Sequence, residues 1–106
     1  MNKTEGLVRL DLNNPTFQER LFALEKPERL AALETLAKLS RLTWSQVYGD
    51  KGLHWEKIAS VKPPAGVAAL YCLRITRSRR ATAYRDGDFV RLLTIALDHD
   101  STYGKK

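Results

Sequence analysis

The stretch that decides the expected fold is Leu73-Arg74-Ile75-Thr76-Arg77-Ser78-Arg79-Arg80-Ala81-Thr82-Ala83-Tyr84-Arg85-Asp86-Gly87-Asp88-Phe89-Val90-Arg91-Leu92. An Asp-Gly pair between alternating apolar runs is the strongest short-range hairpin signal, and Asp86-Gly87 predicts a type I′ turn between two strands. The polar positions are mostly arginine: Arg74, Arg77, Arg79, Arg80, Arg85 and Arg91. Cations held on a rigid sheet form a surface suited to binding a polyanion.

The length and composition predict one domain, residues 1–106. Of the 106 residues 43% are hydrophobic, enough for an independent core. The sequence has no apolar run of the length, about 18 residues, that a membrane span needs, and its first residues contain no apolar signal segment. We therefore expect a cytoplasmic protein with no membrane partner. The single cysteine, Cys72, is expected to be a small buried hydrophobic residue.

The net positive charge of the chain lies in its second half. Residues 1–50 hold seven basic and seven acidic side chains, whereas residues 51–106 hold eleven and five, which accounts for the whole net charge of +6. This asymmetry predicts an anionic partner that docks on the second half. The alternative is a basic surface that serves solubility alone.

The order of apolar patterns predicts an α+β fold. A strand over 7–12 is followed by a helix with Asn14 as N-cap and Pro15 in its first turn. A second helix begins at 26–28, and the two are expected to form an antiparallel helical hairpin. The expected apolar face of the second helix comprises Leu30, Leu33, Leu36, Ala37 and Leu39. A capping box at Thr43 starts a short helical turn, and strands are expected over 54–58, 67–76 and 89–97. The hairpin should pack on one face of an antiparallel sheet of four to five strands.

The opposite face of that sheet should be open. In the strand over 67–76 the face expected to be buried comprises Val67, Ala69, Tyr71, Leu73 and Ile75. Arg74 and Glu56 should lie on the open face. The alternation leaves two choices for the next strand, and either Arg80, Thr82 and Tyr84 or Ala81, Ala83 and Arg85 join them there.

The residue types favour RNA strand cleavage over other chemistry. Metal-ligand spacing, a glycine-rich phosphate loop and a serine-nucleophile elbow are all missing from the sequence, so we expect no metal and no small-molecule cofactor. Attack by the ribose 2′-hydroxyl on phosphorus needs only a base, an acid and cations. The candidate catalytic residues are Glu56, Arg74, Arg80, His99 and Tyr103, and the candidate RNA-binding residues are Lys57, Arg77, Arg79, Arg85, Arg91, Lys105 and Lys106. Glu56 as an ordinary exposed carboxylate and His99 as a turn residue are the alternatives.

The order of elements resembles the RelE/ParE toxin superfamily. Arg74-Ile75-Thr76, then Arg80, Tyr84, a turn, an apolar strand and the terminal His99 and Tyr103 are similar to YoeB-type ribosome-dependent mRNA interferases. The resemblance covers most of the chain as topology and residues 53–103 as a motif. It implies a toxin of a type II toxin–antitoxin system that cuts mRNA on the ribosome, and a cognate antitoxin as partner. A non-cleaving, gyrase-directed ParE-like protein and a small basic nucleic-acid-binding module remain alternatives.

Overall fold

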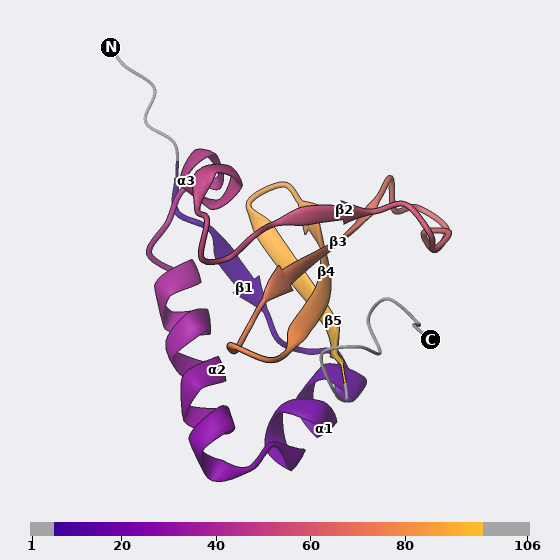
Figure 1. The fold of residues 1–106 in the computed structure, drawn as a ribbon. Coiled ribbons are helices and arrows are strands. Elements are labelled where there is room, and N and C mark those ends of the chain that lie inside the picture. Colours follow the sequence, from indigo (N-terminus) through magenta and orange to yellow (C-terminus); the bar gives the residue numbers. More distant parts are fainter. Residues whose placement is uncertain (1–5, 97–106) are drawn as a thin grey trace.

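The computed structural model describes residues 6–96, which form an α+β fold. Three helices and a five-stranded mixed sheet make up this part of the chain (Figure 1). In chain order the elements are β1 (Arg9–Asp11), α1 (Pro15–Ala23), α2 (Lys26–Leu39), α3 (Trp44–Gly49), β2 (Glu56–Ile58), β3 (Leu70–Arg74), β4 (Arg80–Asp86) and β5 (Phe89–Ile95).

The sheet has the strand order β1-β5-β4-β3-β2, with β4 at its centre. The pairs β2–β3, β3–β4 and β4–β5 are antiparallel, whereas β1 pairs parallel to β5. The prediction of a wholly antiparallel sheet was therefore wrong at β1. A parallel pair needs a long crossover, and the helices and the strands β2 to β4 supply it between β1 and β5.

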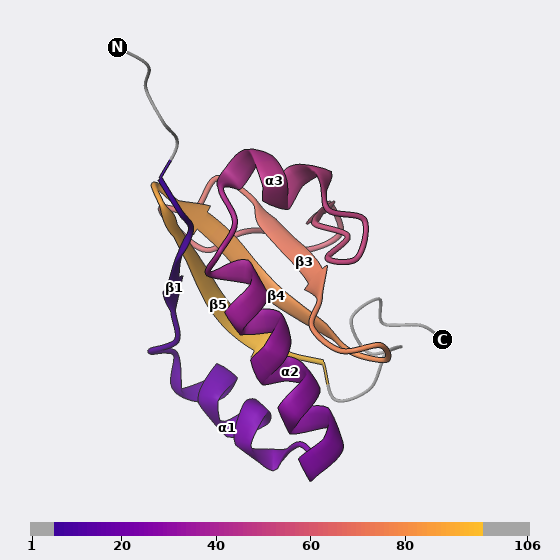
Figure 2. The same ribbon diagram turned by 90° about the vertical axis from the view of Figure 1, so that its left-hand side faces the viewer.

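The helices cover a single face of the sheet, as Figure 2 shows. The core between the two layers receives Phe17 and Leu21 from α1 and Trp44 and Val47 from α3, all at most 4% exposed. The opposing sheet residues are Leu73, Ala81, Ala83, Val90, Leu92 and Ile95. Burial of this apolar area is the main stabilising contribution to the fold.

The expected leucine face of α2 is only partly correct. The structure buries Ala32, Leu36 and Leu39, spaced at i, i+4 and i+7, whereas Leu30 is 53% and Leu33 46% exposed. The reason is the path of the helix: α1 and α2 diverge in a V from their junction and do not lie flush along each other (Figures 1 and 2). α2 therefore buries the face that joins the core cluster and leaves Leu30, Leu33 and Ala37 in solvent.

Both predicted N-caps are confirmed. The side-chain oxygen of Asn14 accepts hydrogen bonds from the backbone N–H groups of Thr16 and Phe17 at 2.8 and 3.2 Å. Thr43 accepts from the Gln46 N–H at 3.2 Å, and the Gln46 side chain accepts from the Thr43 N–H at 2.9 Å. These caps satisfy N–H groups that have no partner inside the helix and fix where α1 and α3 begin.

The β4–β5 turn is confirmed in place but has a different type. Asp86 pairs with Phe89, which leaves Gly87 and Asp88 as the two-residue loop. Gly87 has φ +62°, and Asp88 is not among the described residues with positive φ. Positive φ at the first loop position alone is the pattern of a type II′ turn, where glycine is preferred. The expected type I′ turn at Asp86-Gly87 was therefore wrong in type, and the two loop residues are Gly87 and Asp88, one position later.

The strand expected over 67–76 is shorter, and its faces differ from the prediction. Only Leu70–Arg74 form β3, because the preceding loop extends to Val67. In this loop Gly66 has φ +83°, and the Val67 N–H donates a hydrogen bond to the Pro64 carbonyl. Val67 and Ala69 thus precede the strand and Tyr71 is only half-buried, while Leu70 and Cys72 are buried on the other face. The expected burial of Leu73, Ile75 and Cys72 is confirmed. β1 and β2 are likewise shorter than predicted.

A bulge in β5 breaks its simple alternation. Thr82 pairs with Thr94 but Ala83 pairs with Leu92, so Leu93 has no partner in the ladder. The extra residue allows Leu92 and Ile95 both to face the helices. Ala81 and Ala83 are fully buried in that core, so Arg80, Thr82 and Tyr84 lie on the face turned away from the helices. This face, which also holds the buried Leu70 and Cys72, is called the open face below.

Candidate nucleic-acid interface

Three predicted catalytic residues lie on the open face of three neighbouring strands. Glu56 of β2 is opposite Cys72 of β3, and Arg74 is opposite Arg80 of β4. Directly opposed residues in an antiparallel pair share a face, with their Cβ atoms about 4.5–5.5 Å apart. A contact of 3.7 Å from the Arg80 Nη1 atom to the Cys72 Sγ atom agrees with this face. The structure thus places one carboxylate and two guanidinium groups on the same face of neighbouring strands.

His54 adds an imidazole that the sequence reasoning treated only as a strand residue. Its Nε2 atom lies 3.4 Å from Oε1 of Glu56, and both side chains are about half exposed, at 48% and 51%. His54 has φ +52°, in the left-handed region where histidine is enriched over most residues, so it ends the loop and does not continue β2. Its position two residues before Glu56, just after Gly52, was the available signal.

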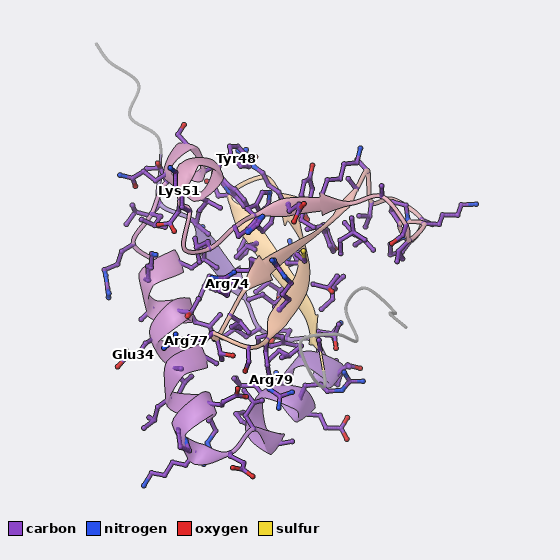
Figure 3. The ribbon with its side chains drawn as sticks, viewed as in Figure 1. Glu34, Tyr48, Lys51, Arg74, Arg77 and Arg79 are labelled. Atoms are coloured by element: carbon purple, nitrogen blue, oxygen red, sulfur yellow. The ribbon has the colours of Figure 1, made fainter. Side chains whose placement is uncertain are left out.

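Arg74, the last residue of β3, and Arg77, in the turn that follows it, are exposed cations. Within residues 6–96 neither side chain forms an ion pair. Both border a cavity of about 240 Å³ between β3 and α2. Lys38 lines the same cavity and is held by Asp50 at 3.0 Å. Figure 3 shows Arg74 and Arg77 along this side of the sheet, with Glu34 pointing outward from α2.

Arg79 joins the β3–β4 turn to the helices. It forms an ion pair with Glu28 of α2 and donates to the Ala96 carbonyl at 3.1 Å, while Ser78 Oγ donates to Glu28 at 2.6 Å. The hydrogen bond from Ser78, followed by the guanidinium of Arg79, holds the pKa of Glu28 below its ordinary value, against the opposing effect of burial. Arg79 therefore has a structural role, and its RNA binding stays a prediction.

Arg91 is also engaged with acids. Its Nη1 atom donates to Asp11 at 2.6 Å and its Nε atom to Asp86 at 2.9 Å. The hydrogen bond from Arg91 lowers the pKa of Asp11, and the hydrogen bonds to Asp11 and then Asp86 raise the pKa of Arg91. These contacts join β1 to β5 and neutralise part of the open face, so Arg91 offers a phosphate less charge than Arg74 does.

The remaining predicted residues fall in other places. Lys57 is exposed on β2, opposite Tyr71, and therefore points to the other face from Glu56. Arg85 reaches α3, where its Nη1 atom donates to the Tyr48 hydroxyl at 2.7 Å. The other four, His99, Tyr103, Lys105 and Lys106, lie outside the described residues.

A further cavity lies away from the open face, and the charged side chains of Arg20, Glu28 and Arg79 on its wall already form hydrogen bonds or ion pairs within the protein. It has about 570 Å³ and lies between α1, α2 and the end of β5. Arg20 on its wall donates to the Ile95 carbonyl at 2.8 Å, and Arg79 and Glu28 pair with each other there. These contacts hold the end of β5 against the helices.

Comparisons with known proteins give no assignment: no protein-family model, no curated protein and no solved structure matches the chain. In the part that the structure describes, no three His, Cys, Asp or Glu side chains are grouped as metal ligands would be. Among the helices of residues 6–96, none has the length and apolar character to cross a membrane. The function of the chain therefore has to be inferred from the geometry of the site.

Proposed function

We propose that this protein is a toxin-like endoribonuclease that cuts mRNA on the ribosome. One observation carries the proposal: Glu56, Arg74 and Arg80 share the open face of three adjacent strands, and the imidazole of His54 lies 3.4 Å from Glu56. A carboxylate beside an imidazole, with two guanidinium groups on the same surface, is the set that phosphodiester cleavage requires.

The reaction would proceed by attack of the ribose 2′-oxygen on the adjacent phosphorus. The bond from phosphorus to the 5′-oxygen breaks, which leaves a 2′,3′-cyclic phosphate and a 5′-hydroxyl. Glu56 accepts the proton of the 2′-hydroxyl, and Arg74 and Arg80 stabilise the charge that grows on the phosphate oxygens. A proton must reach the leaving 5′-oxygen. The resemblance gives this role to His99 or Tyr103, and His54 is a further imidazole beside Glu56.

The partners follow from the same surface. The substrate is RNA on the ribosome, and the net charge of +6 in residues 51–106 favours approach to ribosomal RNA. A toxin of this kind needs a cognate antitoxin, which would have to cover the open face to silence it. Ribosomes and mRNA place the activity in the cytoplasm.

Induced expression in a bacterial host tests the proposal. Wild type is expected to arrest growth and to produce new mRNA 5′ ends that depend on translation. Arg80→Ala is expected to abolish both effects. Arg41→Ala is the matched control, because Arg41 is an exposed arginine that follows α2 on the helical side, and it should behave as wild type. Intact mRNA in the wild-type culture would contradict the proposal.

A second candidate is a non-cleaving member of the same superfamily, such as a gyrase-directed ParE-like protein. The spacing of His99 and Tyr103 favours it, because Asp100, Ser101 and Thr102 separate residues that are adjacent in the interferases. Growth arrest with intact mRNA would support this candidate. No arrest, with RNA intact, would argue against both toxin hypotheses and leave the basic nucleic-acid-binding module as the alternative to test.

A further inference from the structure

We propose that the aromatic groove around Tyr48 and Trp55 binds an unpaired base of single-stranded RNA. The groove is defined by Tyr48, Trp55, Tyr71 and Arg85, and it lies where α3 meets the edge of the sheet. The proposal deepens the proposed function, on which it rests for RNA as the ligand, and it adds a site for the base next to the groups that would act on the phosphate.

The rings of the groove are held in fixed positions. Trp55 stacks on Tyr71, with ring centroids 4.9 Å apart and an angle of 16° between the planes, and meets the buried Trp44 edge-on at 5.2 Å. Tyr48 packs against Trp44 at 5.6 Å and is still 53% exposed. An aromatic ring that is rigid and half in solvent offers a stacking surface at little entropic cost.

Two cavities have Tyr48 and Trp55 in common. One has about 320 Å³ and is lined further by Gly49, Asp50, Lys51 and His54. The other has about 230 Å³ and is lined further by Ala68, Ala69, Tyr71, Arg85 and Gly87. The first volume lies at the lower end of the range of about 300 to 1,000 Å³ that is usual for sites of drug-sized molecules, and the second falls below it. Each cavity is therefore of a size for a small planar group such as a single nucleobase. Figure 3 shows Tyr48 and Lys51 together at this end of the molecule.

The polar groups of the groove match a base and its phosphate. Arg85 donates to the Tyr48 hydroxyl at 2.7 Å and to the Gly87 carbonyl at 2.8 Å, which fixes its guanidinium 4.7 Å from the centre of the Trp44 ring. A guanidinium held in this way can stack on a base or meet a phosphate. The Nε1–H of Trp55 is buried and has no acceptor within residues 6–96. Because this atom is buried, a base in the groove does not reach it, and the polar match rests on Arg85.

His54 connects this groove to the open face. It lines the cavity of about 320 Å³ together with Trp55 and Lys51, and its Nε2 atom lies 3.4 Å from Glu56. A base held between Tyr48 and Trp55 therefore puts its own sugar and phosphate near the edge strand β2. The groove would position the RNA chain, and the open face would act on it.

The test measures binding of a short 2′-O-methyl single-stranded RNA to the full chain at fixed salt. This probe lacks the 2′-hydroxyl nucleophile, so binding is read without cleavage. Tyr48→Ala is expected to weaken binding roughly 5- to 150-fold, the equivalent of the about 1–3 kcal/mol that one stacked base contributes. Tyr48→Phe keeps the ring and should bind nearly as wild type. Phe22→Ala, which removes an aromatic side chain of α1 that is 66% exposed, is the matched control and should leave binding unchanged.

An abasic oligonucleotide with the same number of phosphates separates stacking from charge. We expect it to bind as weakly to wild type as the complete RNA binds to Tyr48→Ala. Equal affinity of wild type for the abasic and the complete strand, or equal loss in Tyr48→Ala and Phe22→Ala, would overturn the proposal. Binding that depends on Tyr48, together with intact mRNA when wild type is expressed in the bacterial host, would support the groove and reject cleavage, so the two failures are distinguishable.

Discussion

Gly87 shows how one backbone angle fixes the β4–β5 hairpin. Its φ of +62° lies in the left-handed region, and a Cβ atom added there would meet no other atom within 4 Å, so backbone strain alone opposes a side chain. Gly87→Ala is expected to lower the free energy of unfolding by about 1–2 kcal/mol, measured by urea denaturation.

Gly49 provides the matched control for that prediction. It ends α3, the space for a Cβ atom is equally open, and its φ is not positive. Gly49→Ala is expected to leave stability unchanged or to raise it by about 0.5–1 kcal/mol, because alanine loses less entropy than glycine in a helix. Equal destabilisation by both substitutions would contradict the assigned turn.

At the residue scale, the features predicted correctly are those that depend on residues close together in the sequence, such as helix caps. Asn14 and Thr43 act as N-caps because their side chains satisfy N–H groups only a few residues away. His54 was missed for the opposite reason: its left-handed φ and its contact with Glu56 depend on where the loop after α3 meets the sheet edge. No short sequence pattern encodes that meeting.

The ion pair between Glu28 and Arg79 is the contact that joins α2 to the β3–β4 turn. Both side chains are less than one third exposed, at 29% and 25%. Glu28→Gln is expected to lower the free energy of unfolding by about 1 kcal/mol at neutral pH, because a charged hydrogen bond and an ion pair are lost together.

The pH dependence of this variant has a defined sign. The pKa of Glu28 in the folded protein is below its ordinary value of 4.5. Its stabilising effect is therefore complete above about pH 4.5 and is lost as the pH falls through the lower folded-state pKa. The difference between wild type and Glu28→Gln should shrink below that pH in acid titrations of stability. A difference that stays constant from neutral to acid pH would show that Glu28 does not act as a carboxylate.

Element boundaries and faces were predicted less well than element types. All three helices and the hairpin fall where the sequence pattern indicates. The bulge at Leu93 and the early end of β3 were not predicted, because each depends on the neighbouring strand. The split of the α2 leucines likewise follows from the angle at which α2 leaves α1, which tertiary packing sets.

The whole molecule divides its cations between structure and an exposed surface. Arg79 and Arg91 are ion-paired with Glu28, Asp11 and Asp86, and they hold elements together. Arg74 is exposed and makes no ion pair within residues 6–96. The sequence analysis gave all three a role with RNA, Arg74 in catalysis and the other two in binding, because the sequence does not show which acids the fold brings to each one. The parallel pairing of β1 was hidden for the same reason, since its partner lies at the far end of the chain.

Cleavage of RNA by the group of Glu56, Arg74 and Arg80 is tested most directly by the chemistry of the cut ends. Purified wild-type protein would be added to translating ribosomes, and new RNA ends would be captured by a ligation that requires a 5′-hydroxyl. We expect such ends with wild type and a loss of about 10²- to 10⁴-fold in their rate of formation with Glu56→Gln, the range for one general base.

Glu34→Gln is the matched control, because Glu34 is an exposed carboxylate that points outward from α2 (Figure 3). It should produce the same ends at the wild-type rate. Captured 5′-hydroxyl ends that depend on Glu56 and not on Glu34 would establish the open face as a cleavage site. Ends that form equally with wild type and Glu56→Gln, or no ends with any of the three proteins, would contradict the claim.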